Sequence, residues 1–232
     1  MLYQGVSSFK TCRPWLHLIR GGLLLIAISL WSYGIKTAPM ITATLMSFTV
    51  PIFVLLLAPI FLPERVTWLM WMATCIGFGG IAIILQPEKT SLGHAHLSFV
   101  CATLAFSLLD IINKKYVTQE PMLGMLFYAT MVATIFLAFP ALYLTHIPTK
   151  HDLKWLGILG VGSNLILYFL LKAFSLASAS SLAPFRYLEL LMSIGVCYVL
   201  FQEPPTSYSY LGAALIIPST LLIVYTQHSN TE

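Results

Sequence analysis

Arg186 and Glu189 are two ionisable residues inside a long apolar stretch, in the sequence Pro184-Phe185-Arg186-Tyr187-Leu188-Glu189. Their i, i+3 spacing places both on one face of a helix. A charge deep in a membrane costs about 3 kcal/mol or more, so such residues face a protein interior rather than lipid. The pair predicts either a polar pocket, which we favour, or a self-neutralising pair that only fixes helix packing.

Asp110 and Asn113 form a second polar pair with the same spacing, directly before Lys114 and Lys115. The two lysines are expected to anchor this helix end in the headgroup region. For Asp110 two interpretations stay open, because its carboxylate could serve a substrate or a gate, or it could pair with Lys114 four residues on.

Aromatic residues are numerous, and most should lie at the membrane interface or against lipid. A minority could form a cage for a cationic ligand, because ring faces attract positive charge. The candidate substrate-binding residues are Arg186, Glu189, Tyr187, Asp110, Asn113, Trp31 and Tyr33.

Enzymatic and metal chemistry find no support in the sequence. His94-Ala95-His96 has no third ligand nearby, and the four cysteines lack the spacing of a zinc site or disulfide framework. No Ser/His/Asp order, G-x-S-x-G or H-E-x-x-H motif occurs. We therefore expect no catalytic residue, metal or cofactor. The net charge of +4 forms no basic stripe, which argues against a nucleic-acid partner.

The composition demands a membrane. The 232 residues are 58% hydrophobic and 9% charged, whereas soluble domains are roughly 45–50% apolar and about 25% charged. A spanning helix needs about 20 apolar residues, and helices satisfy their own backbone groups in lipid. The sequence predicts an all-α membrane protein of about eight transmembrane helices, near 14–36, 38–62, 66–86, 95–113, 122–145, 153–176, 178–201 and 207–226.

The distribution of Lys and Arg predicts that both termini are cytoplasmic. One side of the predicted bundle collects Lys10, Arg13, Arg20, Arg65, Lys114, Lys115 and Lys172. The other side collects Lys36, Lys89, Lys150 and Lys154, and Arg186 is left out because it lies within a helix.

A weak internal repeat relates Tyr33–Glu64 to Lys172–Glu203 by a shift of 139 residues. Ala38 then falls on Ala177, and Glu64 on Glu203. Five helices separate the starts of the copies, so the second is inverted, as in many secondary transporters. The alternative is that any two apolar hairpins look alike.

Two helix ends carry a family resemblance, Phe61-Leu62-Pro63-Glu64 and Leu200-Phe201-Gln202-Glu203. The chain resembles the drug/metabolite transporter superfamily, EamA type, which has ten helices in two inverted five-helix repeats. The stretches around Asp110 and Arg186–Glu189 are most similar to the branch that takes up S-adenosylmethionine in intracellular bacteria. The resemblance implies a partial first EamA repeat of three helices at 11–90 and a second repeat of five helices at 91–228.

The resemblance also implies a function in the bacterial inner membrane: import of S-adenosylmethionine, in exchange for S-adenosylhomocysteine as a finer expectation. Arg186 would bind the substrate carboxylate, and Glu189 or Asp110 the amino or sulfonium charge. Tyr187 and other aromatics would stack the adenine or face the sulfonium. The implied partners are the small-molecule substrate and the lipid bilayer, and a homodimer is compatible with the sequence.

Two departures from the family keep alternatives open. The chain begins where the third helix of the family would begin, so an N-terminally shortened bundle is expected, and Leu190 stands where many EamA members carry Pro. The alternatives are an EamA-type transporter of other amino acids, amines or drugs, and a truncated, inactive membrane remnant.

Overall fold

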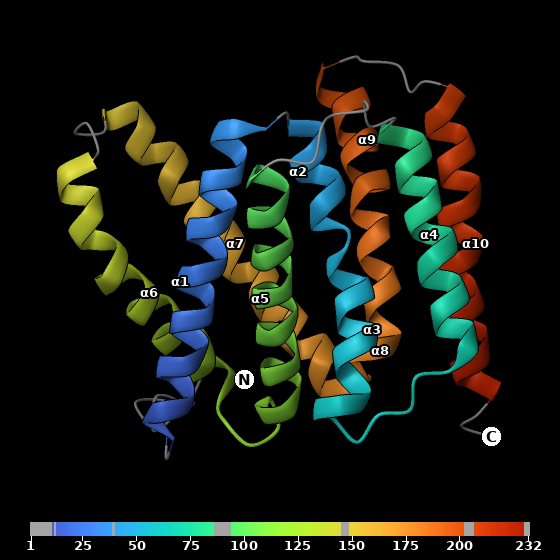
Figure 1. Cartoon of the computed structure of the whole chain (residues 1–232), viewed down its shortest axis with the longest axis horizontal. Helices are drawn as coiled ribbons and strands as arrows, with labels where there is room; N and C mark the ends of the chain where they lie inside the picture. The colour runs from blue at the N-terminus through green and yellow to red at the C-terminus, as the bar shows by residue number, and fades with distance from the viewer. Residues whose placement is uncertain are drawn as a thin grey trace.

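Helices make up the computed structural model of the chain (Figure 1). It describes residues 11, 13–38, 40–85, 94–144, 149–201 and 207–229, and these contain no strand. The helices are α1 (Pro14–Thr37), α2 (Met40–Ser47), α3 (Val50–Phe61), α4 (Trp68–Leu85), α5 (His94–Tyr116), α6 (Met122–Leu144), α7 (Lys150–Leu176), α8 (Ala179–Leu182), the 3₁₀ helix η2 (Ala183–Tyr187), α9 (Leu188–Phe201) and α10 (Ser207–Ser229). The prediction of an all-α membrane protein is confirmed.

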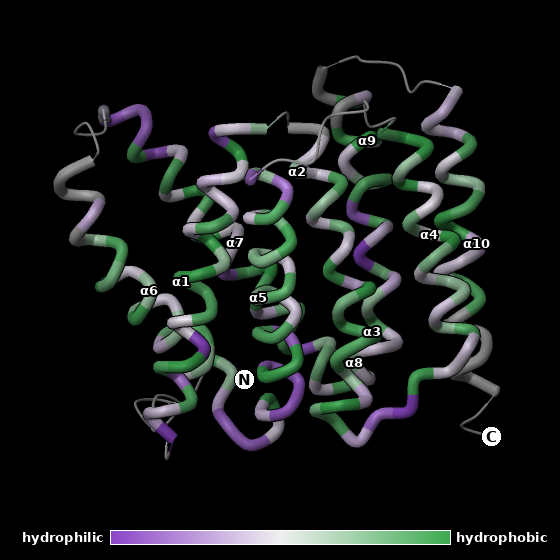
Figure 2. The backbone as a smooth tube through the Cα atoms, in the orientation of Figure 1, coloured by the Kyte–Doolittle hydropathy of each residue, from purple (hydrophilic) through white to green (hydrophobic). Residues whose placement is uncertain are grey.

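Five stretches of the described chain are long and apolar enough to cross a membrane. They are Pro14–Thr37, Thr42–Phe61, Trp68–Leu85, His94–Tyr116 and Lys150–Leu176, and the shorter apolar helices Met122–Ala138 and Ser207–Leu222 accompany them. Hydrophilic residues gather mainly near the upper and lower ends of the helices (Figure 2). This distribution matches a bundle solvated by hydrocarbon along its length.

Two of the eight predicted spans are broken helices rather than continuous ones. The span at 38–62 divides into α2 and α3, where Pro51 stands in the first turn of α3 and supplies no backbone N–H to continue the preceding helix. The span at 178–201 divides into α8, η2 and α9, with Pro184 in the first turn of η2. Each break leaves irregular backbone that must lie against protein rather than lipid.

The links that precede the broken helices have the same local geometry. Ala38 ends α1 in an extended conformation (φ −129°, ψ 156°), and its N–H donates to the carbonyl of Gly34 at 3.0 Å. Ala177 ends α7 in the same way (φ −137°, ψ 163°), and its N–H donates to the carbonyl of Ala173 at 2.9 Å. These alanines are the pair that the proposed repeat aligns.

Two helices pack closely where glycine leaves their facing surfaces without side chains. Gly80 of α4 and Gly212 of α10 let two backbones meet, because a Cβ on Gly212 would lie 2.6 Å from the carbonyl oxygen of Gly80. Elsewhere α1 packs on α5 and α6, and α3 packs on α5. The start of α1 and the end of α10 lie at the same end of the bundle, the lower one in Figure 1. The broken segments lie between these pairs and carry the candidate site.

Candidate functional site

An ion pair joins two helices near the middle of the bundle. Arg186 of η2 donates from Nη2 to Oδ2 of Asp110 on α5 at 2.6 Å, and the two side chains are 31% and 8% exposed. Arg186 is therefore not self-neutralised by Glu189, and Asp110 does not pair with Lys114. Both local pairings considered from the sequence are wrong, because the true partner lies 76 residues away.

Lys114 binds the end of another helix instead. Its Nζ donates to the carbonyl oxygens of Phe174 and Ala177, each at 2.7 Å. These carbonyls belong to the last turn of α7 and to its C-cap residue, where a cation satisfies acceptors that the helix leaves open. Lys114, which follows Asp110 by four residues on α5, thus fixes the end of α7 to α5.

Two cavities flank Arg186, which lines both. The first, of about 220 Å³, is mostly apolar and also contains Asp110, Phe174 and Phe185. The second, of about 260 Å³, contains Glu189 and the aromatic rings of Trp31, Phe48 and Phe106. Ligand pockets usually measure about 300–1,000 Å³, a size that the two reach only if they act together across Arg186.

The second cavity combines a carboxylate with an aromatic wall. Glu189 is exposed to it, while Trp31 is held edge-on by Phe99 and Phe106 at ring-centroid distances of 5.0 and 6.4 Å. Aromatic faces and a nearby carboxylate both attract a cation. The site can therefore receive a ligand that carries one anionic and at least one cationic group.

The remaining predicted residues lie outside these two cavities. Tyr187 is 0% exposed, packs against Phe48 and Gly77, and its hydroxyl has no hydrogen-bond partner within the described part of the chain. Asn113 is 1% exposed and binds Arg20, whereas Tyr33 is 53% exposed. The structure brings together Arg186, Asp110, Glu189 and Trp31.

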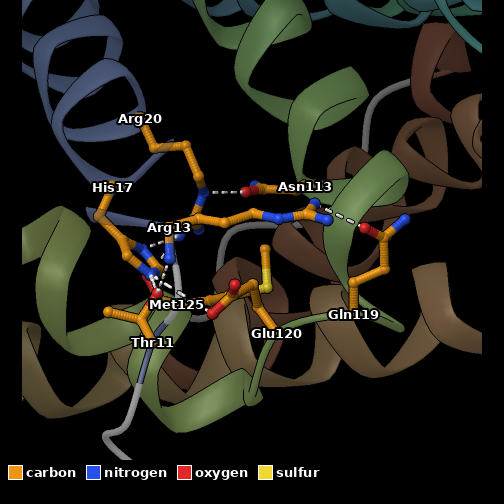
Figure 3. A network of polar contacts seen from close by, with 8 residues as sticks. All are labelled: Thr11, Arg13, His17, Arg20, Asn113, Gln119, Glu120 and Met125. Carbon is orange, nitrogen blue, oxygen red and sulfur yellow. Dashed lines mark hydrogen bonds and ion pairs between the residues drawn. The ribbon is translucent and has the colours of Figure 1, made fainter. Parts of the chain in front are cut away.

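Sequence reasoning missed a buried role for Arg20, which was assigned to the cytoplasmic surface. Its side chain is 1% exposed and donates to Oδ1 of Asn113 and to the carbonyl of Met125, each at 2.8 Å (Figure 3). Hydropathy treats an arginine near a helix end as a surface anchor. The i, i+3 spacing of His17 and Arg20 could have indicated a buried pair.

Glu64, noted only as part of a helix-end pattern, caps α8. Its carboxylate accepts from the backbone N–H of Ala179 at 2.9 Å, and from the N–H and hydroxyl of Ser180 at 3.1 and 2.8 Å. A carboxylate at a helix N-terminus accepts hydrogen bonds from free N–H groups and interacts favourably with the positive end of the helix dipole. Glu64 and Lys114 together define the link between α7 and α8.

Comparison with known proteins gives consistent matches. The model of the EamA-like transporter family matches residues 2–86 and 94–225. The S-adenosylmethionine uptake transporter of Rickettsia bellii is 44% identical over 230 residues, which cover 98% of this chain and 78% of that protein. The protein of the same name in Rickettsia prowazekii is 40% identical, over 98% of this chain and 77% of that protein.

Matches at lower identity include a protein of another name and a solved structure. The riboflavin transporter of Rhizobium johnstonii is 31% identical, over 95% of this chain and 73% of that protein. A crystal structure of another protein superposes with a TM-score of 0.81 at 17% identity, over 98% of this chain and 82% of that one. At that identity the likeness shows the fold alone.

Proposed function

The chain belongs to the EamA-like transporter family, and from this premise we propose that it imports S-adenosylmethionine across a bacterial inner membrane. Family membership makes it a membrane transporter of small molecules and not an enzyme, as the sequence predicted. The choice of substrate is supported by the names of the more similar relatives and by the chemistry of the site.

The Arg186–Asp110 ion pair is the observation that carries this proposal. S-adenosylmethionine has an amino-acid end, with a carboxylate and an ammonium group on one carbon. Such an end can bind both members of the pair at once. The Arg186 guanidinium binds the ligand carboxylate in a forked contact, and the Asp110 carboxylate binds the ligand ammonium group. Neither charge is then left unpaired in a low-dielectric interior.

The net charge of the site matches that of the ligand. Two carboxylates, on Asp110 and Glu189, and one guanidinium, on Arg186, leave one net negative charge around the cavities. S-adenosylmethionine carries one net positive charge, which resides on its sulfonium. We place the sulfonium beside Glu189 and the adenine along the rings of Trp31, Phe48 and Phe106. Tyr187, Asn113 and Tyr33 receive no direct contact in this arrangement.

Exchange with S-adenosylhomocysteine follows as the finer part of the proposal. That product shares the amino-acid end and the adenosine but lacks the methyl group and the positive sulfur. It can therefore use the Arg186–Asp110 pair while making no charge contact with Glu189. One site would then bind both ligands in turn, as exchange requires.

Uptake of radiolabelled S-adenosylmethionine into cells that express the chain tests the proposal. Arg186→Ala should reduce uptake to the background of empty-vector cells, whereas Arg65→Ala, at an exposed arginine, should keep it. Immunoblots of isolated membranes check that both variants are present in equal amounts. Normal uptake by Arg186→Ala would remove this residue from the site.

A competition panel separates the alternatives. Unlabelled S-adenosylhomocysteine should compete with the labelled substrate, whereas amino acids, amines and riboflavin at the same concentration should not. Stronger competition by any of these would assign the transporter to that class of substrate. A chain that transports no member of the panel would favour the inactive alternative.

We also propose the division into repeats at 11–90 and 91–228. The matching extended caps at Ala38 and Ala177, each before a broken helix, support it. If the two repeats move relative to each other during transport, cross-links that fix α3 to α8 should stop uptake while leaving the protein in the membrane. Uptake by the cross-linked protein would argue against alternating movement of the repeats.

The exposed side of α7 needs a cover of lipid or of a second copy of the chain. Only 6% of its most apolar window is buried, and no neighbouring atom of the described residues lies within 4 Å of a Cβ built on Gly157. We propose hydrocarbon as the cover, with a homodimer as the second arrangement. A Gly157→Cys variant in a cysteine-free background that forms disulfide-linked dimers in membranes would establish the homodimer.

A further inference from the structure

A second buried cluster of ionisable residues lies where α1 meets the end of α5 and the start of α6 (Figure 3). Its members His17, Arg20 and Glu120 are 3%, 1% and 7% exposed. His17 and Arg20 belong to α1, and Glu120 lies in the connection between α5 and α6. None of the three lines the two cavities around Arg186, so the transport site already described does not account for them.

His17 stands between a cation and an anion. Its Nδ1 lies 3.4 Å from Nη1 of Arg20, and its Nε2 lies 3.0 Å from the hydroxyl of Thr11 and 3.7 Å from Oε2 of Glu120. The neutral form with the proton on Nε2 fits both sides, because Nδ1 then accepts from Arg20 while Nε2 donates toward Thr11 and Glu120. A second proton on Nδ1 would face the guanidinium and weaken that contact.

The other polar groups around the cluster are already engaged. Arg13 donates to Oε1 of Gln119 at 2.6 Å and lies 5.2 Å from the ring centroid of Tyr116. On α6 the ring of Tyr128 lies 4.9 Å from that of His17. Glu120 is thus the anion that faces His17, with Arg20 and Arg13 as the nearby cations.

A cluster that only joins α1 to its neighbouring helices would not need titratable groups. Burying ions is costly, and neutral amides or hydroxyls could join the same helices. The cluster also has access from outside, because a cavity of about 550 Å³ is lined by Thr11, His17 and Tyr128 together with apolar residues. A proton that reaches His17 through this cavity does not cross the two cavities around Arg186.

Helix α5 connects the cluster to the transport site. Asn113 accepts from Nε of Arg20, and Asp110, one turn away on the same helix face, holds Arg186. Arg20 contacts His17 and is also bonded to Asn113 and to the carbonyl of Met125, so the charge on His17 acts on a side chain that holds α5 and α6. A change of protonation in the cluster thereby reaches the helix that carries Asp110.

We propose that the His17–Glu120 pair is a proton-binding site that takes up and releases one proton in each net transport cycle. This inference rests on the proposed function, because the cycle it joins is that of S-adenosylmethionine. The proton comes from water at one face of the membrane and returns to water at the other, and no co-reactant is needed. Exchange of one substrate molecule for another leaves the proton in place.

The test uses the full chain in proteoliposomes that contain the pH dye pyranine. With the wild-type protein, net uptake of S-adenosylmethionine should change the lumenal pH, and unlabelled substrate inside should exchange for labelled substrate at equal pH. His17→Gln and Glu120→Gln should lose the pH change at least tenfold but keep exchange within about threefold. His151→Gln, at an exposed histidine at the start of α7, should behave as the wild type.

Each outcome decides between the two proposals. Net uptake by the wild type without any change of lumenal pH would overturn the proton site and leave the proposed function intact. The proton site would equally be overturned if both variants kept the pH change, or if both lost exchange, because the cluster would then be only structural. Absence of wild-type exchange would count against the proposed function itself.

Discussion

At the scale of single residues, Glu189 should distinguish the two ligands of the exchange. It borders the second cavity, and its charge has a counterpart in the sulfonium but none in S-adenosylhomocysteine. Glu189→Gln should therefore weaken S-adenosylmethionine binding by about tenfold, which corresponds to about 1.4 kcal/mol, with little change for S-adenosylhomocysteine. Competition curves with both ligands measure this ratio. Equal weakening of both would mean that Glu189 contacts a shared group.

Trp31 and Tyr33 are a matched pair of aromatic residues on α1. Trp31 lines the second cavity, whereas Tyr33 is 53% exposed. Trp31→Ala should lower the affinity for substrate by about tenfold or more, because base–aromatic stacking contributes roughly 1–3 kcal/mol. Tyr33→Ala should change it less than twofold. Concentration dependence of initial uptake rates gives both values, and the reverse order would place the ligand on the other face of α1.

The sequence indicated which residue types form the site but not their partners. Arg186, Asp110 and Glu189 stood out because ions inside apolar stretches are rare. Helical spacing, however, reveals only local pairs such as Arg186 with Glu189. The partner of Arg186 depends on how η2 packs on α5, and that contact spans 76 residues. Arg20 was misplaced for the related reason that its burial depends on α5 and α6 closing over it.

At the scale of elements, Gly77 on α4 makes room for the segment that carries Arg186. A Cβ at Gly77 would lie 2.3 Å from Cδ2 of Tyr187, whose ring is fully buried in the adjoining core. Gly77→Ala should therefore destabilise the fold by about 1–3 kcal/mol, as overpacking does. It should also lower uptake, because η2 must shift with Tyr187.

Gly79 provides the control on the same helix. In the described part of the chain no neighbouring atom lies within 4 Å of a Cβ built there, so Gly79→Ala should be neutral or stabilising by up to about 1 kcal/mol through helix propensity. Thermal unfolding of the detergent-solubilised variants, followed by tryptophan fluorescence, compares the two. Equal melting temperatures for both variants would show that the Tyr187 ring accommodates a Cβ at Gly77 without a loss of stability.

The cap of α8 is a second feature at this scale. Glu64→Gln removes the charge that faces three donors of Ala179 and Ser180, and it should destabilise the link between α7 and α8 by about 1–2 kcal/mol. Faster trypsin cleavage near Lys172 in membranes would report the loosened link. An unchanged cleavage rate would mean that Lys114, through its bonds to α7, holds the link alone.

The elements themselves were predictable where hydrophobic length alone determines them. The apolar stretches that became α1, α4, α5 and α7 are each long and apolar enough to cross a bilayer, so helices followed from the physics of lipid. The division of 178–201 into α8, η2 and α9 was not predicted, because apolarity continues through it. Only Pro184 signals the break, and its effect depends on the packing of Arg186 and Tyr187 around it.

At the scale of the whole molecule, the positions of the charged ends predict an orientation in the membrane. The helix ends that carry Arg13, Lys114 and Lys172 share the edge where α1 begins and α10 ends, whereas α7 begins with Lys150 at the other edge (Figure 1). Lysine and arginine near the ends of spans are retained on the cytoplasmic side. We therefore expect Lys115 to be cytoplasmic and Lys154 to face outward.

Single cysteines in a background without the four native ones test this orientation. Lys154→Cys should react with a membrane-impermeant maleimide in intact cells, whereas Lys115→Cys should react only after the membrane is permeabilised. The opposite pattern would place the His17–Glu120 cluster at the outer face, since it lies near the start of α1 and the end of α5. The proton would then be exchanged with the outside medium through the same cavity, so the labelling result fixes the face from which that site is filled.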